Sequence, residues 1–158
     1  MRYSGPEMLK AIKRVLAAAP AGAREVSSHE RRHLQIAVAV LLHEARRSDY
    51  VQRAAETDAA VQALGELFAL APAESAALLE QGREKAEQLT SFYAPVSVIK
   101  RDFSPEERIR LVEHLWRVAY ADGRLDPHED HYVRKIAHLL YVPNTQSMLA
   151  RNRARPQP

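Results

Sequence analysis

Residues 111–140 read LVEHLWRVAYADGRLDPHEDHYVRKIAHLL, in which two apolar stripes are separated by a polar turn. Within each stripe the apolar side chains recur at the spacing of one face of an α-helix. The first stripe consists of Ile109, Val112, Leu115, Trp116 and Ala119, and the second of Tyr132, Val133, Ile136, Leu139 and Leu140. Two such helices joined by a short turn are expected to pack as a hairpin, with both stripes in a hydrophobic core.

Both helices of this hairpin have capping sequences at their starts. Ser104 and Asp126 each stand immediately before a proline, and a glutamate follows three positions after each cap, Glu107 and Glu129. The Ser or Asp side chain can accept a free backbone N–H, and proline at the first helical position needs no donor. The glutamate favours the positive end of the helix and can close a capping box. These patterns predict that the two helices begin at the prolines.

The rest of the chain shows the same helical character. Strong helix formers dominate, and no segment alternates polar and apolar residues for long. Helices are predicted near residues 7–18, 30–48, 55–70, 74–90, 95–101, 105–120, 127–141 and 144–152. A chain of 158 residues that is 46% hydrophobic can fill one core. We therefore expect an all-α, compact single-domain bundle of about seven or eight helices.

A weak internal repeat runs along the chain at an offset of 73 residues, pairing Asp49 with Asp122 and Glu56 with Glu129. Both copies read apolar helix, acidic turn, glutamate and apolar helix. Two weakly related helical hairpins packed in one bundle are the expected arrangement.

The charge of the chain is concentrated at its end. The formal net charge is +3, and without Arg151, Arg153 and Arg155 there are 20 basic and 20 acidic residues. A neutral body argues against nucleic-acid binding. The predicted division is an N-terminal helix and linker (1–28), a helical domain (29–150) and a basic disordered tail (151–158).

Several classes of function find no support in the sequence. The absence of cysteine excludes disulfides, thiolate zinc sites and a cysteine nucleophile, and it fits a cytoplasmic location. The apolar run 34–42 is much shorter than the roughly 20 residues of a membrane-spanning helix. Neither a phosphate-binding glycine loop nor a nucleophile elbow is present, so we expect no enzyme.

The densest polar cluster is the segment Ala121–Glu129, the acidic turn. Its Asp-Gly-x-Leu-Asp-x-x-Glu pattern matches the second half of a helix–loop–helix calcium loop, but Val118 and Tyr120 occupy the places of the first carboxylates. Turn and capping roles explain the same residues without a metal. The candidate ligands of a divalent cation are Asp122, Asp126 and Glu129, followed by Asp49 and Glu56. Calcium or magnesium is expected before zinc, for which His128 and His131 offer only a pair of imidazoles.

Residues 111–140, together with FSPEER at 103–108 and MLKAIK at 8–13, resemble the TerB-like family, the tellurite-resistance protein B family. The resemblance implies an all-helical bundle with an acidic patch proposed to bind metal cations. It also implies a role in tellurite or stress resistance, within a membrane-associated complex. The family's Asp-Gly-x-x-Asp-x-x-Glu pattern falls on the acidic turn, whereas the first copy has Tyr50 and Arg53 where glycine and a second acid are expected.

The predicted function is a non-enzymatic, TerB-like cytoplasmic module associated with stress or tellurite resistance. Its expected ligands are partner proteins and a divalent cation at the acidic turn, and peripheral association with the inner membrane face is compatible with it. The alternative is a purely structural helical adaptor, or a homodimerisation domain, without an ion site. An apolar patch left exposed after the helices have packed would favour that alternative.

Overall fold

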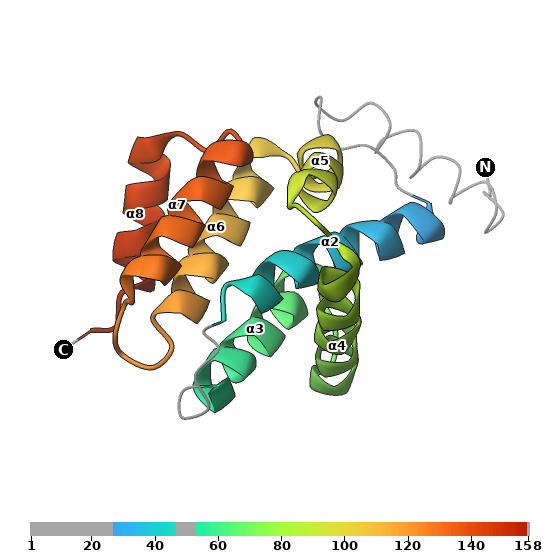
Figure 1. Ribbon diagram of the computed structural model, residues 1–158, viewed down its shortest axis with the longest axis horizontal. Coiled ribbons are helices and arrows are strands. Elements are labelled where there is room, and N and C mark those ends of the chain that lie inside the picture. Colours follow the sequence, from blue (N-terminus) through green and yellow to red (C-terminus); the bar gives the residue numbers. More distant parts are fainter. Residues whose placement is uncertain (1–26, 47–52, 158) are drawn as a thin grey trace, which may run out of the picture.

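The computed structural model describes residues 27–46 and 53–157, and in these residues it contains seven α-helices and no strand (Figure 1). The all-α fold class is thereby confirmed. The helices are α2 (Ser28–Glu44), α3 (Arg53–Phe68), α4 (Pro72–Gln88), α5 (Tyr93–Asp102), α6 (Pro105–Ala119), α7 (Pro127–Leu139) and α8 (Asn144–Ala154). The helix predicted near 7–18 lies outside the described residues.

Two helices, α2 and α6, form the centre of the bundle. Helix α2 packs against α3, α4, α5 and α6, while α6 packs against α3, α7 and α8 as well. In Figure 1, α6, α7 and α8 lie side by side, and α2, α3 and α4 form the neighbouring group. Each group contributes one central helix to a common core. The division into two related hairpins stays a prediction.

The core is densest along α2, because neighbouring helices cover it on several sides. Val38, Ala39, Val40, Leu41 and Leu42 are five consecutive residues of α2 with at most 1% of their surface exposed. A one-sided amphipathic helix would expose some of these positions. The apolar run 34–42, which is too short to span a membrane, therefore lies in the central core helix α2.

Helices α2 and α4 approach each other unusually closely at Gly82. A Cβ atom at this position would lie 2.6 Å from the Cβ and 2.7 Å from the carbonyl carbon of Ala39. These distances are far below van der Waals contact, so only glycine fits opposite the α2 backbone. Gly82 thus fixes how α4 and α2 pack.

The α6–α7 hairpin begins as the sequence predicts. The Glu107 N–H donates to Oγ of Ser104 at 3.2 Å, and the Ser104 N–H donates to Oε1 of Glu107 at 2.9 Å, which closes a capping box. The Arg108 guanidinium donates to the Leu140 carbonyl at 2.8 Å and so joins the start of α6 to the end of α7. A cation at the C-terminal end of a helix satisfies a free carbonyl and favours the dipole.

The predicted boundary of the disordered tail needs a correction, because α8 continues to Ala154. The Arg151 guanidinium donates to the Tyr120 hydroxyl at 3.1 Å and lies 5.6 Å from the centre of the Trp116 ring. Arg153 pairs with Glu113 of α6. These partners, on α6 and at its C-cap, contact two of the three tail arginines, which belong to the last helix.

Candidate functional site

The acidic turn connects α6 and α7 and is closed by local hydrogen bonds. Oδ1 of Asp122 accepts the N–H of Arg124 at 3.1 Å, and Oδ1 of Asp126 accepts the N–H of His128 at 2.7 Å. Gly123 has a φ of 88°, a left-handed conformation that favours glycine. Both aspartates therefore stabilise the turn and the start of α7.

The two glutamates of the predicted ion site are buried. Glu56 lies in the first turn of α3 and is 0% exposed, and Glu129 lies in the first turn of α7 and is 6% exposed. Asp122 and Asp126 are only partly buried. The residues paired by the repeat, Glu56 and Glu129, thus share both helical position and burial.

The described residues contain no group of three or more His, Asp or Glu side chains that could hold a metal ion. Asp122, Asp126 and Glu129 are close in sequence, yet they do not form such a group. His128 and His131 are exposed and do not belong to one either. Asp49 lies outside the described residues, so a site that includes it stays a prediction.

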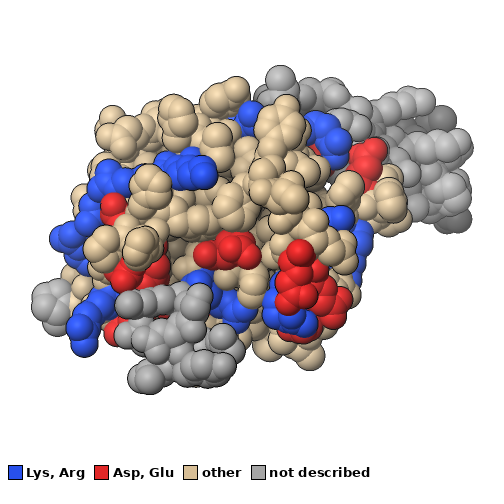
Figure 2. Space-filling view, in the orientation of Figure 1, with Lys and Arg blue, Asp and Glu red and all other residues tan. Residues whose placement is uncertain are grey.

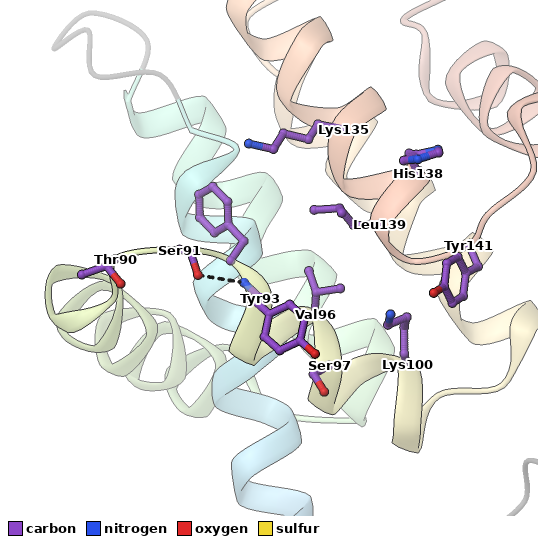
Figure 3. A pocket seen from close by; sticks show the side chains of 11 residues that line it. Thr90, Ser91, Tyr93, Val96, Ser97, Lys100, Lys135, His138, Leu139 and Tyr141 are labelled. Atoms are coloured by element: carbon purple, nitrogen blue, oxygen red, sulfur yellow. Dashed lines mark hydrogen bonds between the residues drawn. The ribbon is translucent and has the colours of Figure 1, made fainter.

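A second candidate site is a groove between α5 and α7, with a cavity of about 530 Å³. Its lining residues are Thr90, Ser91, Phe92, Tyr93, Val96, Ser97, Lys100, Lys135, His138, Leu139 and Tyr141. In Figure 3 one wall comes from α5 and the turn before it, and the other from the C-terminal half of α7 and from Tyr141, which follows the C-cap of α7. Leu139 points from α7 toward α5 across the groove (Figure 3). The volume is in the range of small-molecule and peptide side-chain pockets.

One ring that lines the groove, Phe92, is held by aromatic packing. The rings of Phe92 and Tyr132 meet edge to face with their centres 5.6 Å apart. The Tyr132 hydroxyl donates to the Leu41 carbonyl of α2 at 2.7 Å, and burial raises its pKa well above the ordinary value. Through Tyr132, the Phe92 ring is thus joined to α7 and to the central helix α2.

The rim of the groove carries exposed aromatic rings and positive charge. Tyr93 is 77% and Tyr141 is 74% exposed, more than any other large apolar or aromatic side chain that the structure describes. The Lys100 ammonium lies 4.3 Å from the centre of the Tyr141 ring, and Lys135 stands on the α7 wall. The described lining residues include no carboxylate.

Comparison with known proteins gives one family. The family model of tellurite resistance protein TerB matches residues 35–152. The chain belongs to the TerB family. Among curated proteins and among solved structures, no match is found.

The match to the TerB family begins within α2 and ends in α8, so it includes both the acidic turn and the groove. Of the described helices in this TerB-family chain, none is both long and apolar enough to cross a lipid bilayer. The family resemblance of residues 111–140 is confirmed by the match.

Tyr141 of this TerB-family chain has a backbone conformation that favours glycine. Its φ is 58°, at the position that directly follows the C-cap of α7. The Tyr141 N–H donates to the His138 carbonyl at 3.1 Å and the Val142 N–H to the Ala137 carbonyl at 2.9 Å, the two bonds of a Schellman motif. A tyrosine here stores backbone strain while its ring remains exposed.

Sequence reasoning did not find the groove. It assigned Leu139 to the core and placed Tyr141 within the helix 127–141, whereas α7 ends at Leu139. The one local signal is an aromatic residue shortly before Pro143, because proline often follows a helix end. The rest of the groove depends on how the fold places α5 relative to α7, which no short-range pattern encodes.

Proposed function

We propose that this TerB-family chain is a non-enzymatic module that binds a partner protein through the α5–α7 groove. The observation that carries the proposal is the pair of exposed rings, Tyr93 and Tyr141, beside a cavity of about 530 Å³. Tyrosine is enriched at binding hot spots, since its ring buries a large area and its hydroxyl tolerates water. Two such rings beside one cavity offer a large contact area to a partner.

A binding role is favoured over catalysis by the placement of the titratable groups. His43 has its pKa lowered to about 4 by burial and by Arg46, and its ring is held by the Arg46 guanidinium, outside the groove. The pKa of His114 is lowered by burial and by Arg117, and this ring also lies outside the groove. Neither of these two perturbed histidines lines the α5–α7 groove, so neither could act on a ligand bound there.

The biological setting forms part of the same proposal. The family is described by tellurite resistance, so we place the chain in a tellurite or stress response, on the cytoplasmic side of a membrane-associated complex. The absence of cysteine supports a reducing compartment. Deleting the gene and restoring it with wild type or with Tyr93→Ser should give growth on tellurite for wild type alone.

Binding of calcium or magnesium at the acidic turn remains a separate prediction. It requires oxygen donors beyond Asp122 and Asp126, because a calcium ion takes six to eight oxygens. Glu129, backbone carbonyls, water or carboxylates from outside the turn would have to supply the rest.

The proposed function is tested by photo-crosslinking in the native cell. A photoreactive phenylalanine analogue replaces Tyr93 or Tyr141 and, as the matched control, Leu149, an apolar side chain on α8 that is 46% exposed. We expect a defined covalent adduct from the two groove positions and none from Leu149. Adducts of equal yield at all three positions, or none at the groove, would contradict the proposal. An adduct between two copies of the chain would favour the dimerisation alternative.

A further inference from the structure

We infer, on the basis of the proposed partner binding, that the α5–α7 groove takes an acidic segment of the partner protein. In this segment an aromatic or aliphatic side chain enters between Tyr93 and Tyr141, and flanking carboxylates pair with Lys100 and Lys135. The groove thereby recognises two features of the partner segment, an apolar anchoring side chain and the negative charge beside it.

Charge complementarity supports an acidic partner. Lys100 stands on α5 and Lys135 on α7, so the two ammonium groups approach the groove from opposite walls (Figure 3). None of the lining residues in the described chain is Asp or Glu. In Figure 2, uncharged and basic side chains cover most of the surface over α5 and the C-terminal end of α7, while acidic side chains gather over α4. A segment rich in carboxylates is attracted to this end of the molecule, and a basic one is repelled.

The apolar surface inside the groove supports an anchoring side chain. Val96 is 3% exposed, and Leu139 reaches across from α7 between the two walls. The Phe92 ring, which also lines the groove, packs edge to face on Tyr132. An aromatic or aliphatic side chain placed here would contact apolar atoms of both helices, the arrangement of a buried hot spot with a polar rim.

The conformation of Tyr141 indicates that its side chain is retained for binding. Glycine would relieve the left-handed backbone at this position, yet the chain carries a ring that is 74% exposed. The ring also holds the Lys100 ammonium at 4.3 Å from its centre, on the groove side of α5. Tyr141 therefore positions one of the two charges and forms half of the aromatic rim.

A peptide fits this groove better than a nucleic acid does. Proteins that bind single strands follow the phosphate backbone with a row of cations. The groove instead offers two lysines on opposite walls and includes no arginine among its described lining residues. Two facing charges with an apolar centre match carboxylates on either side of one anchored residue.

The test uses the full-length chain and three pools of short fluorescent peptides, read by anisotropy. Each pool has a central Phe, Tyr or Leu, which is flanked by acids in the first pool, by glutamines in the second and by lysines in the third. We expect the acidic pool to bind at least about tenfold more tightly than the neutral pool, with an affinity that falls as salt is added.

Charge reversal supplies the matched variants. Lys100→Glu with Lys135→Glu should lose binding of the acidic pool and gain binding of the lysine pool. Arg110→Glu with Arg124→Glu, two exposed arginines outside the groove, makes the same change of net charge and should leave binding of the acidic pool within about twofold. Thermal unfolding of each variant confirms that the fold is kept.

The outcomes separate this inference from the proposed function. Two results would overturn the acidic partner. One is binding of the neutral or lysine pool as tight as that of the acidic pool, and the other is an equal loss of binding to the acidic pool in both charge-reversed proteins. The crosslinks at Tyr93 and Tyr141 would still support partner binding in that case. A labelled single-stranded DNA that binds with the same dependence on Lys100 and Lys135 would also overturn it, in favour of a nucleic-acid ligand.

Discussion

The imidazole Nε2 of His114 in α6 lies 3.3 Å from the carboxylate Oε2 of Glu66 in α3. This contact joins the central helix α6 to α3, a helix of the other group. Arg117 extends it, since its guanidinium lies 3.7 Å from Glu66 and 2.8 Å from Glu113. Burial and the nearby Arg117 lower the pKa of His114, so the folded protein holds this ring neutral near pH 7.

Acidification should lower the free energy of unfolding. His43 and His114 both have a pKa below the ordinary 6.5, and that of His43 is about 4. In this pH range the two histidines of the unfolded chain therefore bind protons that the same histidines of the folded chain do not bind. The stability contributed by the neutral rings is complete above pH 6.5 and declines as the pH falls from 6.5 toward 4. Fully buried histidines would give a slope of about 1.4 kcal/mol per pH unit each, and solvent screening reduces it here.

Urea denaturation at several pH values checks this dependence. The double variant His43→Gln, His114→Gln should show a flatter profile between pH 6.5 and 4. The exposed His128→Gln is the control and should keep the wild-type slope. A wild-type protein that gains stability as the pH falls through this window would contradict the assignment.

Gly82→Ala should destabilise the fold by about 1–3 kcal/mol, because the new methyl group would overlap Ala39 of α2. Helix propensity alone favours alanine over glycine by about 1 kcal/mol, so the sign of the change identifies the close approach. Gly123→Ala, where φ is 88° but nothing lies within 4 Å, should cost only about 1 kcal/mol. Chemical denaturation of both variants measures the difference, and a stabilising Gly82→Ala would contradict the packing of α2 and α4.

Asp126→Ala should lower the free energy of unfolding by about 1 kcal/mol, because α7 loses the acceptor for the His128 N–H. If Asp126 acts as a cap, the loss is the same in metal-free buffer and in excess calcium or magnesium. A cation that binds the folded state at this turn would instead stabilise wild type more than the variant. Thermal unfolding with and without each ion distinguishes the two roles. An ion-dependent difference that Asp49→Asn also removes would establish the predicted site.

Tyr141→Gly should stabilise the fold and weaken partner binding. Removing a side chain from a φ of 58° relieves strain, while loss of the Lys100 contact offsets part of the gain, which leaves about 0.5–1 kcal/mol. Tyr141→Ala loses the ring without relieving the backbone and should give no such gain. Stability is measured by denaturation and binding by anisotropy with the acidic peptides. A destabilised Tyr141→Gly would mean that the ring serves the fold.

The features that the sequence predicts correctly are local ones. Ser104 and Asp126 cap their helices because the cap and the amide it accepts are only two or three residues apart. Pro95 shows the limit of such rules. The helix predicted near 95–101 begins two residues earlier, at Tyr93, so Pro95 is buried at the third position of α5, where its missing N–H costs nothing.

Features that depend on contacts between distant residues could not be predicted. The sequence predicts Arg151 to be part of a basic tail. In the structure its partners are Trp116 of α6 and Tyr120 at the end of that helix. The carboxylates of the acidic turn match a calcium pattern, but Asp122 and Asp126 accept backbone N–H groups and Glu129 is buried. The groove arises only when the fold brings α5 and α7 to the two sides of one cavity.

The affinity of the crosslinked partner for the purified chain tests the central claim most directly. Isothermal titration would compare wild type with Tyr93→Ser, on the groove rim, and with Leu149→Ser on α8. A partner bound in the α5–α7 groove should lose about tenfold or more in Kd with Tyr93→Ser and less than about twofold with Leu149→Ser. Equal affinities for wild type and Tyr93→Ser would contradict the groove as the binding site.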